Sequence, residues 1–386
     1  MLQNAFRGGK GYWALLGGWA ILIALGAAAY GRQLTEGLTI TGMSRDVSWG
    51  LYISQFTFLV GVAASAVMVV LPYYLHNYKA FGRMVILGEF LAVSAVLMCM
   101  LFVFVDMGQP ARVMNVLLHP SPNSVMFWDF MVLTGYLALN LVIGSVTIEA
   151  ERKEARPPRW VRPLIYLSIP WAVSIHTVTA FLYAGLAARP FWMTAILAPR
   201  FLASAFASGP SLLILLALLV RRFGKFDAGR EAVRALSTIV TYAMAINLFF
   251  VLVEVFTALY SGMPDHVRSF SYLFLGLDGH HALTPWTWVG EALSVACAIL
   301  LLIPTVRHQE RYLALLCGGV IAAIWIEKGM ALIVTGFIPS PLEHITEYAP
   351  TLPEVAITVG VYAVGGLVLT TLYKIVLTVR ERVQLA

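Results

Sequence analysis

Ten stretches of this chain are long and apolar enough to cross a lipid bilayer, and this feature limits the possible folds more than any other. Apolar runs of about 20 residues are typical of transmembrane helices, which satisfy their backbone hydrogen bonds internally. Only 12% of the 386 residues are charged, against about a quarter in soluble proteins. The sequence therefore predicts an all-α integral membrane protein with ten transmembrane helices. The predicted spans are residues 13–30, 49–74, 84–105, 127–148, 163–187, 201–220, 237–260, 285–303, 312–334 and 353–377.

The positive charges predict the orientation of these spans. Of the 26 Lys and Arg residues, 19 lie in the two terminal segments and the loops after spans 2, 4, 6 and 8. Six lie in the odd-numbered loops, and Lys328 lies within a span. Because Lys and Arg accumulate on cytoplasmic loops, we expect a protein of the cytoplasmic (inner) membrane with both termini in the cytoplasm. The net charge of +6 is explained in this way, so no nucleic-acid partner is predicted.

The chain also contains a weak internal repeat. Residues 174–185 align with residues 325–336 after a shift of 151 positions, which places His176 over Glu327. We expect spans 2–5 and 6–9 to form two parallel four-helix bundles, with spans 1 and 10 as peripheral helices. No interrupted mid-membrane helix is expected. The predicted units are a first helix with its loop (1–46), the first bundle (47–187), the second bundle (188–336), and the last helix with its tail (337–386).

The first bundle contains the polar residues that best suit chemistry inside a membrane. His176 is an ionisable residue roughly 15 Å deep in span 5, and such residues are rare in hydrocarbon unless they have a function. Asp129 lies at the outer end of span 4, and Tyr136 is two turns deeper on the same face. The simpler alternative is that these side chains only hold helices together or complement a helix dipole. Gln55 of span 2 and Asn140 of span 4 are additional polar candidates.

The second bundle contains a layer of charged residues. Glu254, Glu291 and Glu327 all lie roughly 9–11 Å from the outer surface by helical rise. Adjacent residues on a helix do not face each other, so Lys328 is expected to pair with Glu254 or Glu291 on another helix. Glu89, in span 3, lies nearer the cytoplasmic side. Together these residues suit a proton path, although purely structural salt bridges are the alternative.

Several types of chemistry lack the residues they need. A b-type haem requires paired axial histidines, and only His176 lies well inside a span. The three cysteines are isolated, so neither an iron–sulfur cluster, a disulfide nor another metal site is predicted. A quinone fits better, because its carbonyl oxygens require groups that form hydrogen bonds and exchange protons, as His176 and Asp129 can. We expect a quinone as an exchangeable substrate.

Three stretches resemble a known family. Residues 174–215, together with 49–66 and 105–130, are similar to the NrfD/PsrC family of polysulfide-reductase-type membrane subunits, in particular its DsrP and HmcC branch from sulfur-metabolising bacteria. The resemblance implies paired four-helix bundles, no bound haem or iron–sulfur cluster, and a site near the periplasmic face for menaquinone or ubiquinone as an exchangeable substrate. It implies His176 and Asp129 as the principal site residues, with contributions from Tyr136, Gln55, Arg112 and Trp128.

The resemblance also implies partner proteins. These are a periplasmic ferredoxin-like iron–sulfur subunit, a multihaem cytochrome c, and a second, haem-bearing membrane subunit that has a cytoplasmic iron–sulfur subunit. The expected function is electron exchange between the quinone pool and the periplasmic module, with proton translocation through the second bundle. Two alternatives remain: a secondary transporter that uses the Glu/Lys group, and a purely structural membrane anchor.

Overall fold

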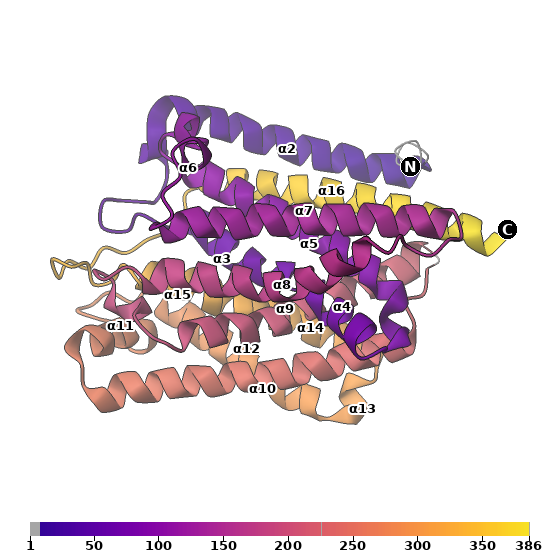
Figure 1. The fold of residues 1–386 in the computed structure, drawn as a ribbon. Helices are drawn as coiled ribbons and strands as arrows, with labels where there is room; N and C mark the ends of the chain where they lie inside the picture. Colours follow the sequence, from indigo (N-terminus) through magenta and orange to yellow (C-terminus); the bar gives the residue numbers. More distant parts are fainter. Residues whose placement is uncertain (1–7, 225, 386) are drawn as a thin grey trace.

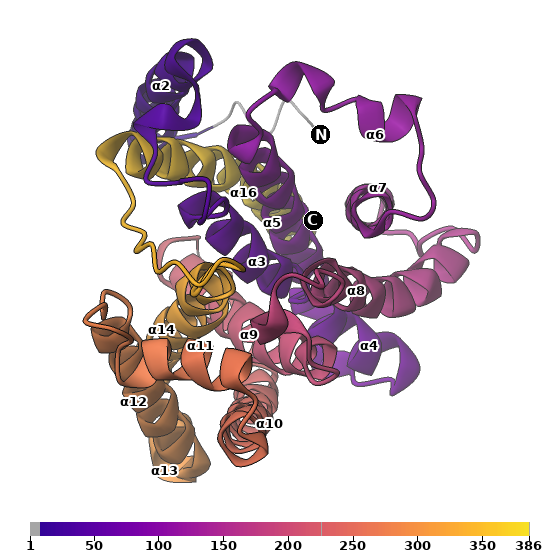
Figure 2. The ribbon, with the colours of Figure 1, turned by 90° about the vertical axis from the view of Figure 1, so that its left-hand side faces the viewer.

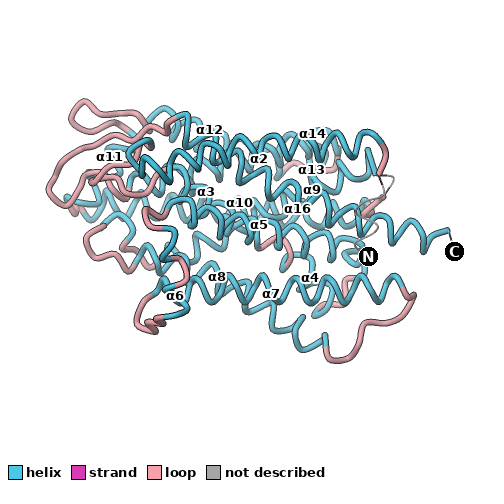
Figure 3. Tube along the Cα trace, turned by 90° about the horizontal axis from the view of Figure 1, so that it is seen from above, coloured by secondary structure: helices cyan, strands magenta, loops and turns pink. Residues whose placement is uncertain are grey.

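The computed structural model describes residues 8–224 and 226–385, which form a layered bundle of long helices (Figure 1). Ten helical segments are long and apolar enough to cross a membrane, which confirms the predicted all-α membrane class. The first and last helices have their chain ends at the same end of the bundle, and the longer connections lie at the opposite end (Figures 1 and 3). We call these the terminus-bearing end and the long-loop end.

The ten spans correspond to these helices: α2 (Lys10–Glu36), α3 (Leu51–Ala63) with α4 (Val67–Leu75), α5 (Gly82–Asp106), α7 (Val125–Arg152), α8 (Val161–Ala184), α9 (Leu197–Gly224), α10 (Arg230–Ser261), α12 (Thr284–Leu302), α14 (Glu310–Ile324) with η5 (Trp325–Ala331) and α15 (Leu332–Thr335), and α16 (Leu352–Leu385). Shorter helices lie in the connections: η1 (Gly37–Ile40), η2 (Lys79–Phe81), η3 (Pro110–Arg112), α6 (Asn115–Leu118), η4 (Pro190–Trp192), α11 (Pro264–Phe274) and α13 (Pro304–Arg307).

Two groups of spans pack side by side in the structure (Figure 2). Helices α3, α5, α7 and α8 form the first bundle, and α9, α10, α12 and α14 form the second. Helix α3 also packs against α9 and η5, so it joins the two bundles. Helix α16 lies against α5 of the first bundle, and α2 lies on α16. The two peripheral helices are therefore neighbours on one side of the molecule.

Two spans depart from regular α-helix, and the expectation of uninterrupted mid-membrane helices is wrong for the first of them. Span 2 is interrupted at residues 64–66, between α3 and α4, although it has no proline there. The interruption lies where α9 approaches closely, since a Cβ atom on Gly209 would lie 3.0 Å from the Ser65 nitrogen. Span 9 contains the π-helical segment η5, which includes both Glu327 and Lys328. Such segments are frequent at functional sites.

An aromatic cluster ties the two bundles together at the long-loop end. The ring of Trp49 stacks on that of buried Trp192, and Tyr183 and Phe337 pack against both rings. The Trp192 indole donates a hydrogen bond of 2.9 Å to the Leu332 carbonyl oxygen. These contacts fix η4 and the end of span 9 against the start of span 2.

Candidate functional site

The first polar group lies within the first bundle, where buried Asp129 of α7 faces Thr179 of α8. The Thr179 hydroxyl lies 2.6 Å from Asp129 Oδ1 and 2.7 Å from the Ile175 carbonyl oxygen. A threonine hydroxyl has one proton, so it cannot donate fully to both oxygens. Both contacts are full hydrogen bonds only when Asp129 carries a proton and donates it to Thr179. The geometry therefore suits a carboxyl group that exchanges a proton.

His176 lies one turn before Thr179 on the same helix, so the two residues share a helix face. Its side chain is 0% exposed. Among the described residues, neither Nδ1 nor Nε2 has a hydrogen-bond partner. Most buried polar atoms in proteins are hydrogen-bonded, and each exception calls for an explanation. In a neutral imidazole one ring nitrogen can donate a hydrogen bond and the other can accept one. His176 therefore offers both a donor and an acceptor inside the first bundle.

Gln55 is placed between the bundles rather than beside the Asp129–Thr179 pair. Its side-chain oxygen accepts hydrogen bonds from the Trp325 indole at 2.8 Å and from the Tyr362 hydroxyl at 2.6 Å. Its amide nitrogen is buried and has no partner among the described residues. Gln55 thus connects α3 to η5 and α16. Its role as a quinone contact remains a prediction.

The other three predicted quinone contacts are spread over the first bundle and its connections. The Tyr136 hydroxyl is buried and lies 3.4 Å from the Ala63 carbonyl oxygen, at the end of α3. Trp128 is 49% exposed, and its indole donates to the Pro122 carbonyl oxygen at 2.7 Å. Arg112 is exposed on η3. Tyr136 is therefore internal, whereas Trp128 and Arg112 belong to the surface of the long-loop end.

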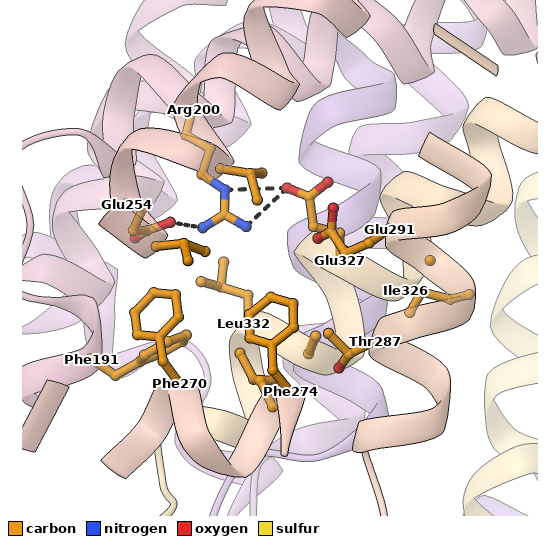
Figure 4. Close-up of a pocket in the computed structure, with 15 residues that line it drawn as sticks. Phe191, Arg200, Glu254, Phe270, Phe274, Thr287, Glu291, Ile326, Glu327 and Leu332 are labelled. Carbon is orange, nitrogen blue, oxygen red and sulfur yellow. Dashed lines mark hydrogen bonds and ion pairs between the residues drawn. The ribbon is translucent and has the colours of Figure 1, made fainter. Parts of the chain in front are cut away.

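The second polar group is centred on Arg200, a residue that the sequence reasoning missed (Figure 4). Its guanidinium contacts Glu254 of α10 through Nη1, and it contacts Oε1 of Glu327 through Nη2 at 2.9 Å and Nε at 3.2 Å. The second oxygen of Glu327 accepts a hydrogen bond of 3.0 Å from the Asn247 amide. Arginine suits this position because its planar fork of donors matches carboxylate geometry.

Arg200, Glu254, Glu291 and Glu327 line one small cavity of about 30 Å³. Glu291 of α12 has no hydrogen-bond or ion-pair partner among the described residues, and it lies beside Glu327 in Figure 4. The rest of the wall is mainly apolar and aromatic, with Phe191, Phe270 and Phe274 toward the long-loop end. A volume of this size has room for about one water molecule. The three carboxylates therefore meet around a polar space that is closed to large ligands.

Lys328 does not pair with Glu254 or Glu291, so that expectation is wrong. Its ammonium instead donates to the Phe201 carbonyl oxygen at 3.3 Å and lies 4.2 Å from the centre of the Phe201 ring. The physical reason is competition, because Arg200 already occupies Glu254 and Glu327. Lys328 is buried and points to the opposite side of η5, toward the first bundle.

Glu89 is an isolated buried carboxyl group in α5. Its Oε2 atom has no hydrogen-bond partner among the described residues. A Cβ atom on Gly144 of α7 would lie 3.4 Å from this oxygen, so the carboxyl group lies between α5 and α7. The structure does not bring Glu89 together with the Arg200 group, and its role as a proton carrier remains a prediction.

Arg200 was missed because it precedes the predicted start of span 6. The helix in fact begins at Leu197, so Pro199 and Arg200 both lie in its first turn. Proline is common in the first turn of a helix, where its missing N–H costs little. Pro199 is therefore the sequence signal from which an earlier start of the helix could have been predicted. Such a start places Arg200 inside the span, within reach of the carboxylates.

An apolar cavity of about 270 Å³ lies between the end of α8 and the start of α9. Ala180, Phe181 and Ala184 form its wall on α8, and Met193, Thr194 and Leu197 are among the residues that close it from the other side. Ala180 directly follows Thr179, so this cavity adjoins the helix that carries both Thr179 and His176. Within the described ranges, no three His, Cys, Asp or Glu side chains are grouped as a metal site requires.

Comparison with known proteins agrees with this architecture. The chain is 27% identical to a putative dimethyl sulfoxide reductase membrane subunit of Halobacterium salinarum, over 93% of this chain and 89% of that protein. It is 23% identical to the "Hdr-like menaquinol oxidoreductase integral membrane subunit" of Archaeoglobus fulgidus, over 96% and 94%. It is 22% identical to the "Menaquinone reductase, integral membrane subunit" of Nitratidesulfovibrio vulgaris, over 90% and 87%.

The sequence model of one protein family, described as "Polysulphide reductase, NrfD", matches residues 39–339. This range contains both four-helix bundles, Asp129, His176 and the whole Arg200 group. The resemblance to the family is thereby confirmed, whereas its DsrP and HmcC branch remains a prediction. The chain belongs to the NrfD family of polysulphide reductase membrane proteins.

Proposed function

We propose that this chain is the quinone-interacting membrane subunit of a multi-subunit respiratory oxidoreductase. The observation that carries the proposal is the polar group on α8, where buried His176 has no partner for either ring nitrogen among the described residues and Thr179 contacts buried Asp129. Oxidation of a quinol releases protons together with electrons, so its site requires groups that accept protons. Two relatives named for menaquinol or menaquinone chemistry support the same substrate class.

The apolar cavity beside α8 supports an access route for the substrate. Its volume of about 270 Å³ suits a quinone ring, and its lining is mainly apolar. A ring that passes from this cavity toward the α8 face of Thr179 and His176 would approach the proton-exchanging groups from the lipid. In this proposal His176 and Asp129 take the protons, and Tyr136 and Gln55 help to orient the ring, whereas Trp128 and Arg112 act nearer the surface.

The proposed complex places this chain in the cytoplasmic membrane with both termini in the cytoplasm and the long-loop end in the periplasm. The electrons pass to a periplasmic ferredoxin-like iron–sulfur subunit and a multihaem cytochrome c. The assembly also includes a second haem-bearing membrane subunit, which has an iron–sulfur subunit on its cytoplasmic side. The first bundle carries the quinone site, and the second carries a proton path through Glu327, Glu254 and Glu291, with Glu89 and Lys328 as further carriers.

A binding experiment tests the proposal directly. The purified complex is irradiated with an azido-quinone, and the labelled peptides of this chain are identified by mass spectrometry. We expect labelling on α8 and in the segment 193–198, with protection by excess menaquinone. Labelling confined to another protein of the complex would contradict the proposal.

Exchange of Asp129 for asparagine is expected to lower quinol-linked electron transfer about 100-fold, the lower end of a general acid–base contribution. Asparagine keeps the volume and can still form a hydrogen bond with Thr179, but it cannot carry an exchangeable acidic proton. Steady-state oxidation of a water-soluble quinol by the purified complex provides the measurement. The control is Thr179→Val, which removes the hydroxyl but keeps the carboxyl group and should cost less. Equal rates for Asp129→Asn and the unaltered chain would remove Asp129 from the site.

A secondary transporter is the second candidate, because span 2 is interrupted inside the membrane and the Arg200 group could bind a coupling ion. Ion-driven solute uptake by the chain alone in liposomes would favour this candidate. The absence of such uptake, together with quinone labelling, would favour the oxidoreductase.

A further inference from the structure

Span 2 is interrupted by a turn at residues 64–66, which separates α3 from α4. Residues 64–66 are buried. Two backbone hydrogen bonds close the turn: Ala64 N donates to Gly61 O at 3.1 Å, and Ser65 N donates to Val62 O at 3.0 Å. Ala64 and Ala66 keep right-handed helical dihedral angles, but these hydrogen bonds span three residues instead of four. Departures from the regular helical hydrogen-bond pattern within a membrane are tolerated only where protein buries them or where they border a water-filled space.

Small residues leave room around the turn. A Cβ atom on Gly61 would lie 3.3 Å from Lys328 Nζ and 3.3 Å from Ser208 Oγ. On the α9 side, a Cβ atom on Gly209 would lie 3.0 Å from Ser65 N and 3.3 Å from the Gly61 carbonyl oxygen. Glycines thus bring η5 and α9 close to α3, and the ammonium of Lys328 lies directly beside this contact.

Several polar groups here lack partners. The ammonium of Lys328 has three donors, and among the described residues only the Phe201 carbonyl oxygen accepts from it. The Ser65 hydroxyl and both ring nitrogens of His176 are also buried and have no hydrogen-bond partner in the described part of the chain. Buried donors and acceptors without protein partners are typical of places that hold ordered water.

We propose that the interruption of span 2 holds ordered water molecules and that Lys328 is the proton carrier of this site, linking the first bundle to the Arg200 group. The inference rests on the proposed function, because it supplies a route for protons released near His176. We call residues 64–66, Gly61, Ser208 and Lys328 the junction. Its ligand is water, and its task is proton transfer between the two bundles.

The chemistry of the junction balances without any further reagent. The ammonium of Lys328 gives one proton to a water molecule on the side of the Arg200 group and becomes a neutral amine. The amine then accepts one proton from water on the side of His176 and becomes an ammonium again, and the proton that the quinol releases restores that water. Successive residues on a helix point in different directions, so η5 presents Glu327 to Arg200 and Lys328 to the junction. One helical turn therefore touches both polar groups.

The test uses the whole complex in liposomes, with quinol as donor and a water-soluble electron acceptor, and it measures protons translocated per electron. We expect Lys328→Met to lower this ratio at least tenfold. The ratio is counted per electron, so a slower electron transfer alone does not change it. The Lys328→Arg variant tests whether the site requires a proton that can be released or only a positive charge. Arginine keeps the positive charge but does not release its proton, so its ratio should fall equally. A normal ratio with Lys328→Arg would show that only the charge matters and would overturn the proposal.

A matched glycine pair keeps the test decisive if the lysine variants fail to assemble. Gly61→Ala adds a methyl group 3.3 Å from Lys328 Nζ, whereas Gly329→Ala adds one 3.3 Å from the Ser54 carbonyl oxygen and touches no ionisable group. The proton ratio should fall severalfold in Gly61→Ala and stay unchanged in Gly329→Ala. Equal ratios in the pair, or no translocation by the unaltered complex, would overturn the junction. Loss of quinol oxidation in Asp129→Asn is independent of these results, so the two proposals can fail separately.

Discussion

Replacement of Arg200 by methionine is expected to destabilise the protein by about 3–5 kcal/mol, the typical cost of removing one partner from a buried ion pair. Arg200 is the cation that contacts both Glu254 and Glu327, and all three side chains are largely buried. Without it, two carboxylates would remain inside the membrane with only the Asn247 amide donating to Glu327. They would have to take up protons or draw in water, and either response weakens the packing of α9 against α10 and η5.

Thermal unfolding of the detergent-purified protein, followed by the loss of monodisperse material, measures this effect. Arg268→Met is the matched control, since Arg268 pairs with exposed Glu343 at 3.4 Å and exposed pairs contribute only about 0–1 kcal/mol. A triple variant with Arg200→Met, Glu254→Gln and Glu327→Gln should recover much of the lost stability, because neutral amides need no counter-charge. If Arg200→Met unfolds at the same temperature as Arg268→Met, the Arg200 group does not stabilise the fold.

The parts of this fold that follow from one-dimensional patterns could be predicted from the sequence. Ten apolar runs become ten spans because a membrane leaves few alternatives to the helix. Helical rise also brings Glu254, Glu291 and Glu327 to a common depth, and the structure places all three around one cavity. The depth of a residue along its helix depends on one segment alone, so it can be predicted without knowing how the helices pack.

The parts that depend on packing between helices could not be predicted in this way. The predicted partner of Lys328 is wrong because the competing cation, Arg200, lies before the predicted start of span 6. The interruption of span 2 falls in the sequence Ala64-Ser65-Ala66, which contains no helix breaker. It becomes understandable only beside Gly209 of α9, which comes within van der Waals distance of the Ser65 backbone. Tertiary contact overrides local helix preference at this position.

Replacement of His176 by leucine is expected to lower quinol-linked electron transfer about 10²- to 10⁴-fold, the usual contribution of a general acid–base group. The same change should leave the unfolding temperature unchanged or raise it. His176 is fully buried, and neither ring nitrogen has a partner among the described residues, so the imidazole contributes no hydrogen bond to stability. An apolar side chain of similar volume removes the cost of burying unpaired polar atoms. A residue that costs stability and is kept for activity is typical of a functional site.

Two measurements on the same sample decide this prediction: the rate of quinol oxidation by the purified complex and its unfolding temperature. Thr335→Val is the control, since Thr335 also has a buried hydroxyl without a partner among the described residues but lies in α15, outside the proposed quinone site. We expect that variant to be stable and fully active. A stable, active His176→Leu variant would assign His176 to packing alone. A variant that is inactive because it fails to assemble would instead show that the imidazole makes a structural contact. Only the combination of lost turnover, retained subunits and an undiminished unfolding temperature supports an imidazole that exchanges protons with a quinone.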